Sequence, residues 1–139
     1  MRISKFQFQN PTLLALKFVV NEDYEQKELN EMKISTMVNV SHQPEENSAL
    51  VRLTLEVGEE NNNSPFFVSV QEQADFLWEK DGDGISEEDL NHLLHQNAPA
   101  LLVSYIRPII ASVTGNSPYP MFHLPYLDLR QTQNEGNDF

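Results

Sequence analysis

The sequence predicts an α+β fold in which a four-stranded antiparallel sheet is covered by one long C-terminal helix. In four successive segments before residue 79, apolar residues alternate with polar ones, which is the period of strands with one buried face. The longest apolar segment follows these four, and its apolar residues recur at helical spacing. Two connections between the strands are short enough for hairpins, so the strands should pair antiparallel and the helix should cover one sheet face.

The first strand is expected between Ile3 and Val20, where apolar side chains fall on even positions. Pro11 lies inside this strand and should interrupt or bulge it, because proline cannot donate to a strand ladder. Residues 21–30 carry four acidic residues and one lysine without periodicity, which predicts a solvated connection. Residues 32–40 alternate again and predict a second strand.

A third strand is expected over residues 49–57, and a fourth begins at Phe66 and continues with weaker alternation to Trp78. Several apolar residues are out of phase with the buried stripes of the four strands, namely Ala15, Val19, Met37, Phe67 and Leu77. The second sheet face should therefore be partly apolar, and one helix cannot cover both faces. We expect copies of the chain to associate as a dimer or a tetramer, which would hide this face.

The long helix is expected to end at Gly115, which stands where a helix C-cap would. Pro99 and Pro108 each lack an N–H, so the helix should bend or begin anew at these positions. Upstream, Ser86 is expected to cap a helical segment, with Asp89 three residues later in a variant capping box. The apolar face of the long helix comprises Leu101, Leu102, Tyr105, Ile106, Ile109 and Val113.

A proline-rich aromatic loop follows this helix. Pro118, Pro120 and Pro125 bias their neighbours toward extended backbone, which presents side chains well. A domain of this size does not need so many apolar residues in one loop for its core, and methionine with aromatics suits adaptable binding of apolar chains. The candidate polypeptide-binding residues are Tyr119, Met121, Phe122, Leu124 and Tyr126, with Phe76 and Trp78 from the fourth strand. The alternative is that the loop merely packs on the sheet.

The order of these features resembles the SecB family of export chaperones over residues 3–130. Family members carry a Pro, a Leu and a Tyr-x-Arg at the start of the long helix, then a Gly, a Pro and alternating Leu residues. This chain has Pro99, Leu102, Tyr105 and Arg107, followed by Gly115, Pro120, Phe122 and Leu124. It departs from the pattern at Ala98, where the family has Cys, and at Val103-Ser104, where the family has Phe-Pro.

The resemblance implies a chaperone that holds unfolded or precursor polypeptides. The family docks the SecA motor through acidic residues near the first strand and the C-terminal tail, but this chain has Ala15 to Val20 at the first of these places. A SecA-like motor, and with it a role in export, is therefore implied by the resemblance alone and is not supported by the residues of the first strand. One rival is a SecB-fold interaction protein dedicated to one partner, such as a regulatory or antitoxin-type chaperone. Another is a small-ligand or calcium-responsive protein.

Composition excludes several classes of protein. The 139 residues predict one domain over residues 1–130 and a polar, flexible tail over residues 131–139. A net charge of −12 argues against binding nucleic acid. The absence of cysteine excludes disulfides and thiolate metal sites and suits the cytoplasm. Without a signal peptide or a run of ~20 apolar residues, we expect no membrane insertion.

No catalytic, cofactor or metal site is predicted. The segment Asp81–Asp89 resembles the start of a calcium loop, but Ile85 follows Gly84 at once and Leu90 stands where a Glu is required, so the register fails. Glu88, His92 and His95 share a helical face, which would allow only weak divalent binding. No nucleotide-binding glycine motif or nucleophile elbow occurs, so we expect no enzyme activity.

Overall fold

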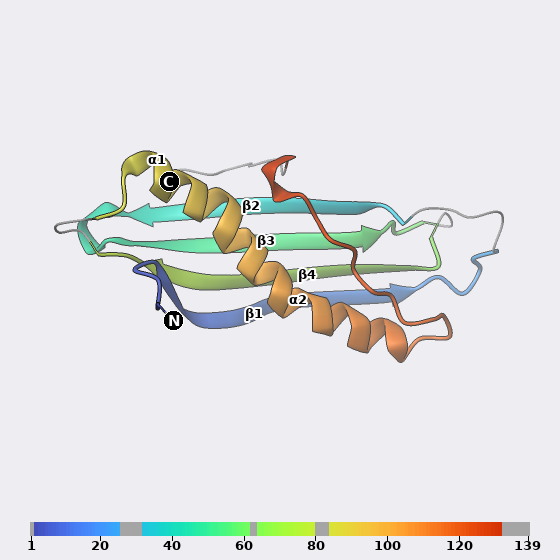
Figure 1. Ribbon diagram of the computed structural model, residues 1–139. Coiled ribbons are helices and arrows are strands. Elements are labelled where there is room, and N and C mark those ends of the chain that lie inside the picture. Colours follow the sequence, from blue (N-terminus) through green and yellow to red (C-terminus); the bar gives the residue numbers. More distant parts are fainter. Residues whose placement is uncertain (1, 26–31, 62–63, 80–83, 132–139) are drawn as a thin grey trace.

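The computed structural model describes residues 2–25, 32–61, 64–79 and 84–131, and it has the predicted α+β architecture (Figure 1). One four-stranded sheet has the order β1-β4-β3-β2, and all of its neighbouring strands are antiparallel. The strands are β1 (Gln7–Val20), β2 (Ile34–Gln43), β3 (Ser48–Gly58) and β4 (Phe66–Leu77). The helical elements are η1 (Pro44–Glu46), α1 (Glu87–His92), η2 (Leu93–Asn97), α2 (Ala98–Gly115) and η3 (Leu129–Gln131).

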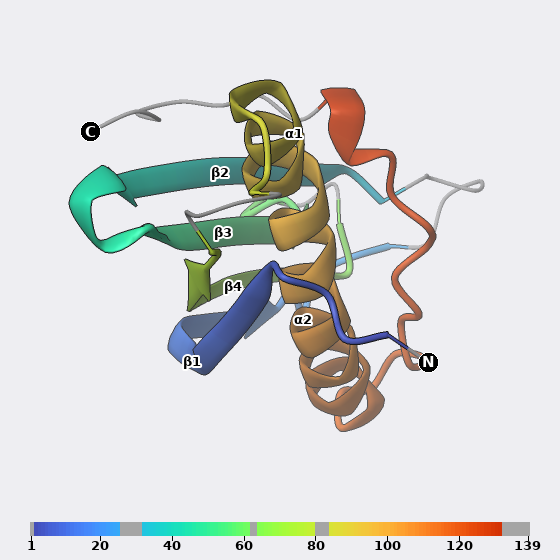
Figure 2. The same cartoon turned by 60° about the vertical axis from the view of Figure 1, so that its left-hand side comes forward.

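Alternation in β3 and β4 fixes which sheet face is buried. Directly paired residues lie on the same face, and Val51 pairs with Val40 on one side and Ala74 on the other. These three residues are buried beneath the helix, as are the other residues in phase with them on β3 and β4. Figures 1 and 2 show α2 crossing this face diagonally, from β2 toward β1.

Strand β1 contains two irregularities of register, between Gln9 and Thr12 and between Leu13 and Ala15. The first lies at the predicted place, beside Pro11, and Asn10 there adopts a left-handed φ of 57°. The second was not predicted. It places Leu13 opposite Glu72 on the helix side, so the even-position rule fails in the middle of β1 and holds again from Leu16, which pairs with Val70.

The helical segment runs without a gap from Glu87 to Gly115. As predicted, the α-helix begins anew beside Pro99, at Ala98, whereas it continues through Pro108. Ser86 caps it as predicted, and its Oγ accepts from the Asp89 backbone N–H at 3.2 Å. Because Pro99 has no N–H, the turn before it cannot keep an unbroken α-helical ladder. Residues Leu93–Asn97 instead form the π-helical turn η2, and the Ala98 N–H donates to the Leu93 carbonyl.

The buried stripe of α2 is centred one residue beyond the predicted one. Leu102, Ile106 and Ile110 are fully buried, and Ala98, Val103 and Thr114 are buried beside them. Leu101, Tyr105, Ile109 and Val113 flank this stripe and are half-buried. Gly115 is the last helical residue rather than the cap, which is Asn116.

By length and composition, the helix Glu87–Gly115 contains an 18-residue window that is apolar enough to cross a membrane. The core helix of a soluble protein can have the same length and composition. Here the apolar stripe of α2 packs against β3 and β4, which accounts for the composition of the helix.

The opposite sheet face carries the out-of-phase residues as predicted. Val19 pairs with Phe67 there, and Met37, on β2, is 39% exposed. Polar pairs lie between these apolar residues: Arg52 donates to Gln73 Oε1 at 3.1 Å, and Gln71 donates to Thr54 Oγ1 at 3.2 Å. The face is thus mixed, and association of copies stays a prediction.

Candidate functional site

The proline-rich loop, defined here as residues 116–128, runs back over the sheet beside α2 (Figures 1 and 2). It has no regular secondary structure, in keeping with its three prolines. Leu124 points into the core with Leu129 beyond the loop, and Phe122 and Leu127 pack against that core. Part of the loop is therefore structural, as the alternative interpretation of the sequence had it.

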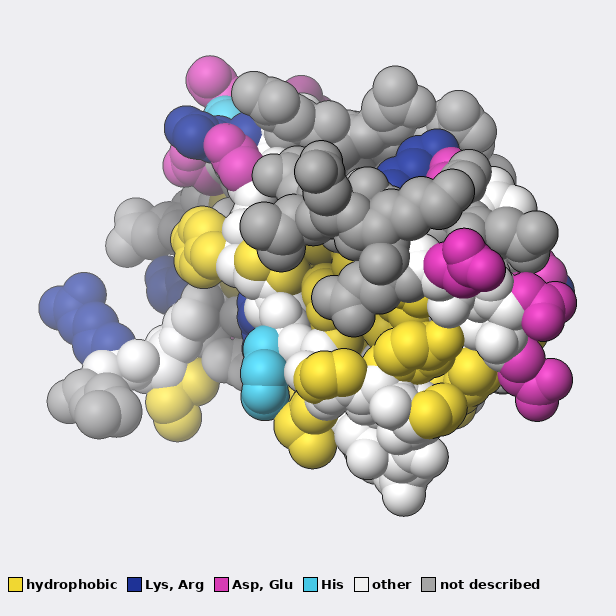
Figure 3. Space-filling model, turned by 90° about the vertical axis from the view of Figure 1, so that its right-hand side faces the viewer, with side chains coloured by type: hydrophobic (Ala, Val, Ile, Leu, Met, Phe, Trp, Pro, Cys, Tyr) yellow, Lys and Arg dark blue, Asp and Glu magenta, His cyan; other side chains and the backbone are white. Residues whose placement is uncertain are grey.

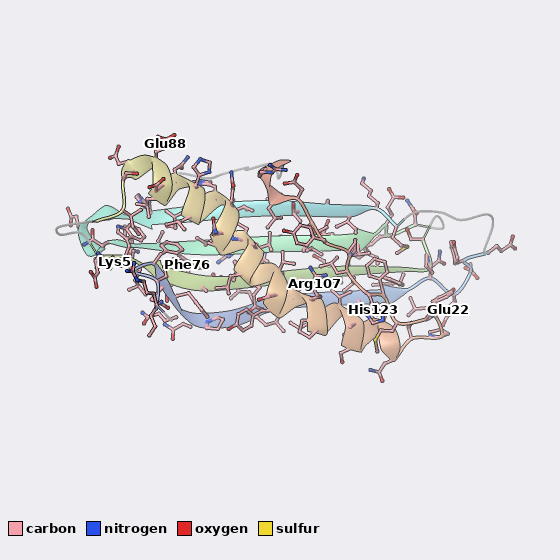
Figure 4. The ribbon with its side chains drawn as sticks, viewed as in Figure 1. Lys5, Glu22, Phe76, Glu88, Arg107 and His123 are labelled. Atoms are coloured by element: carbon pink, nitrogen blue, oxygen red, sulfur yellow. The ribbon has the colours of Figure 1, made fainter. Side chains whose placement is uncertain are left out.

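Two side chains of α2 hold the backbone of the loop. Thr114 Oγ1 accepts from the Phe122 N–H at 2.8 Å. The guanidinium of Arg107 donates to the carbonyl oxygen of Leu124 and, at 3.3 Å, to that of Pro125 (Figure 4). Because prolines leave few backbone donors in this segment, these side-chain hydrogen bonds set its course.

Aromatic contacts fasten the loop to the end of the sheet where β1 stops and β4 starts. The Phe122 ring meets Phe66 edge to face, with centroids 6.0 Å apart. The Tyr119 hydroxyl donates to the Asn21 carbonyl at 3.0 Å, and its ring contacts Tyr24 at 6.1 Å. Tyr119 and Phe122 are consequently half-buried and offer only part of their rings to a partner.

Met121 and Tyr126 are the exposed apolar side chains of the loop, with 48% and 94% of their surface accessible. Figure 3 looks at the end of the molecule where the loop turns back, and hydrophobic side chains gather on that face. Met121 and Tyr126, on a backbone held by α2, each offer exposed apolar side-chain surface of a kind that suits apolar groups of another chain.

Phe76 and Trp78 lie far from the loop. They stand at the end of β4, and the eleven residues from Phe66 to Phe76 span roughly 33 Å of strand. Phe76 is only 2% exposed and belongs to the core, as does Leu124. Trp78 is half-buried and lines a separate cavity. The seven predicted residues therefore do not form one surface.

A surface that the sequence analysis did not single out lies along β1, an edge strand of the sheet. Leu13, Leu14 and Leu16 are exposed there. Opposite Leu13, Glu72 is 3% exposed, and its Oε1 has no hydrogen-bond partner among the residues that the structure describes. Burial raises the pKa of the Glu72 carboxyl. The sequence signal for this buried carboxyl is that Glu72 stands at a position of the fourth strand where the alternation predicts an apolar residue.

Within the described parts of the chain, no group of three or more His, Asp or Glu side chains could hold a metal ion. Of the residues considered for weak divalent binding, Glu88 and His92 are exposed, and His95 Nδ1 lies 3.1 Å from the Asn91 carbonyl oxygen. Asp81 to Asp83, the start of the segment that resembles a calcium loop, lie outside the described residues.

Known proteins resemble this chain in both sequence and fold. The Mycobacterium tuberculosis Rv1957 SecB-like chaperone, solved in complex with a ChAD peptide from the Rv1956 HigA1 antitoxin, superposes with a TM-score of 0.69. It shares 19% identity over 88% of this chain and 90% of its own. A protein of unknown function from Streptococcus agalactiae gives a TM-score of 0.49 at 12% identity, over 87% of this chain and 97% of its own.

A search of curated proteins found no match. A model of the SecB family, described as preprotein translocase subunit SecB, matches residues 17–135. This range includes the last four residues of β1, the other three strands, the long helix and the proline-rich loop. The chain therefore belongs to the SecB family.

Proposed function

We propose that this SecB-like protein is a chaperone that holds non-native polypeptides and uses the proline-rich loop as part of its binding surface. The observation that carries the proposal is the exposure of Met121 and Tyr126 on a backbone that Arg107 and Thr114 hold in place. Apolar groups of a client would be buried there at roughly 25 cal/mol per Å² before entropy costs. A loop that is already ordered loses less entropy on binding.

The proposed site is smaller than the predicted one. Met121 and Tyr126 are its exposed residues, Tyr119 and Phe122 contribute partly covered rings, and Trp78 belongs to a different region. The net charge of −12 would favour basic clients and keep the protein soluble. We place it in the cytoplasm, without nucleotide or catalysis, in keeping with the family and with the absence of cysteine.

We also propose that copies of the chain associate. The 14-residue strand β1 is an edge of the sheet and exposes Leu13, Leu14 and Leu16. A long apolar edge strand can pair with a strand of another chain. In a chaperone of this shape, the other strand would come from a second copy of the same chain. A dimer, or a dimer of dimers, would cover these leucines.

Dedication to one partner is the second candidate. It is favoured by the M. tuberculosis chaperone, because that SecB-like protein is seen in complex with a peptide from an antitoxin. A dedicated chaperone would use the same loop but retain one protein rather than many. Export of clients through a SecA-like motor has no support in the residues of β1, which contains no aspartate or glutamate.

The test is capture of a permanently unfolded polypeptide, followed by its protection from aggregation and by equilibrium titration. The double variant Met121→Ala, Tyr126→Ala should bind about tenfold more weakly, since two exposed contacts are lost. Ile3→Ala, Met37→Ala is a matched control, because these residues are also exposed but lie outside the loop.

Equal loss in both double variants would remove the loop from the site. No capture of any unfolded polypeptide by the wild type, together with recovery of one folded partner from lysate, would replace the general chaperone with the dedicated one.

A further inference from the structure

A cavity of about 530 Å³ opens between the β2–β3 hairpin, the end of β4 and the first turns of the long helix, far from the proline-rich loop. Val40, Trp78, Ile85, Leu90 and Leu94 supply its apolar lining. Its polar lining consists of His42, Asn47, Glu79, Glu87, Asn91 and His95. A volume in this range suits a small ligand or one or two side chains of a polypeptide.

His42 lines the cavity and carries a ring nitrogen without a hydrogen-bond partner among the described residues. It pairs with Ala49 on the helix side of the sheet, and its ring stacks on Trp78 with centroids 5.4 Å apart and planes 19° apart. The Nε2 atom is buried and has no hydrogen-bond partner among the residues that the structure describes. A buried ring nitrogen without a partner is unfavourable unless a bound group or a water supplies the missing hydrogen bond.

The charged residues that line the cavity, among those that the structure describes, are of one sign. They are Glu79 and Glu87, and no described lysine or arginine lines it. Neither carboxylate makes an ion pair with another described residue. The cavity therefore combines an aromatic wall, an apolar wall and a negative rim. The helical wall includes Leu94 and His95 from the π-turn η2, a feature often found at functional sites.

We propose that this cavity receives an arginine side chain of the bound polypeptide. This inference rests on the proposed function and adds a second subsite for the client, separate from the proline-rich loop. A guanidinium is planar and weakly hydrated, so it can lie against the Trp78 ring beside His42 and in the plane of the imidazole. Its N–H groups would donate to His42 Nε2 and to the carboxylates of Glu79 and Glu87. The aliphatic stem would lie against Leu90 and Leu94. Lysine, a compact and strongly hydrated cation, fits this arrangement less well.

Trp78 is the single tryptophan of the chain, so its fluorescence reports directly on the cavity. The probes are three acetylated, amidated pentapeptides that are identical except for a central arginine, lysine or citrulline. Citrulline has nearly the shape of arginine but carries no charge. The arginine peptide should change Trp78 fluorescence in a saturable way, the citrulline peptide should bind at least tenfold more weakly, and the lysine peptide should fall between them.

Glu87→Gln should weaken binding of the arginine peptide several-fold, and His42→Phe should do the same. Glu88→Gln is the matched control for the first, because Glu88 adjoins Glu87 in the first turn of α1 but does not line the cavity. Equal affinities for the arginine and citrulline peptides, or equal effects of Glu87→Gln and Glu88→Gln, would overturn the inference.

Capture of an unfolded polypeptide, measured alongside, separates this inference from the proposed function. If capture persists while arginine and citrulline peptides bind alike, only the arginine subsite is wrong. If the wild type captures no unfolded polypeptide, the proposed function fails, and with it the assignment of the arginine to a held client.

Discussion

The buried hydroxyl of Thr114 joins the long helix to the proline-rich loop. It accepts from the Phe122 backbone N–H at 2.8 Å and donates to the Ile110 carbonyl of its own helix at 2.7 Å. Thr114 is fully buried, so the Phe122 N–H has little access to water if this partner is removed. The position of the loop thus depends on a residue of α2.

Replacing Thr114 by valine, which keeps its shape, should lower the free energy of unfolding by about 1–3 kcal/mol, because it leaves a buried donor unpaired. Thr114→Ser keeps the hydroxyl and is the control, although it loses a methyl group. Urea denaturation measures both. If Thr114→Val is no less stable than Thr114→Ser, the hydrogen bond to the loop contributes nothing measurable.

Phe122→Ala should lower the free energy of unfolding by about 1–2 kcal/mol, less than the ~3–5 kcal/mol typical of a fully buried phenylalanine. The ring is half-buried and contacts Phe66, so it takes part in packing as well as in any binding surface. Leu102→Ala, at a fully buried position of α2, should cost about 2.7–5 kcal/mol. If Phe122→Ala lowers the free energy of unfolding as much as Leu102→Ala does, Phe122 serves only in the core and not in binding.

Glu72→Gln should stabilise the protein at pH 7 and much less at pH 4. Burial raises the pKa of this carboxyl, so the folded state keeps a proton that the unfolded state has already lost. The contribution of Glu72 to stability is therefore full below the unfolded pKa of about 4.3 and is lost as pH rises through the folded pKa. Denaturation of both proteins at the two pH values measures the difference. A difference that does not change with pH would show that the carboxyl titrates alike in both states.

Light scattering at micromolar concentration should give a mass of at least two chains, against 16.0 kDa for one. If the β1 edge is the contact, Leu14→Glu should shift the mass toward one chain, because a charge would have to be buried between copies. Met37→Glu tests the open sheet face in the same way, at a residue that is similarly exposed. A wild-type mass of one chain would contradict association by either surface.

Much of the fold could be predicted because its strands alternate cleanly. Residues 49–57 and 66–76 each keep one alternating phase throughout, and every in-phase residue of these two segments is buried in the structure. In β1 the run Leu13-Leu14-Ala15-Leu16 is apolar at every position, so alternation carries no information about register there. The second irregularity of β1 could not be seen for that reason.

The candidate site could be predicted only in part. The prolines predicted an extended loop, but which of its side chains point outward depends on contacts with Thr114 and Arg107, eight to seventeen residues away in the chain. Sequence spacing does not encode such contacts. The sequence groups Trp78 with the loop as an aromatic residue of the fourth strand, whereas the antiparallel path of β4 places it at the other end of the sheet from Phe66.

We expect clients to contact the exposed side of the proline-rich loop. The most direct measurement places a photoreactive phenylalanine analogue at position 126 or at position 37, and irradiates each protein with an unfolded polypeptide. Both positions are exposed, but Tyr126 lies on the loop and Met37 on the face of the sheet away from the helix. We expect strong crosslinking from position 126 and little from position 37. Crosslinking that is equal at the two positions, or stronger at position 37, would show that the loop is not the main contact with clients.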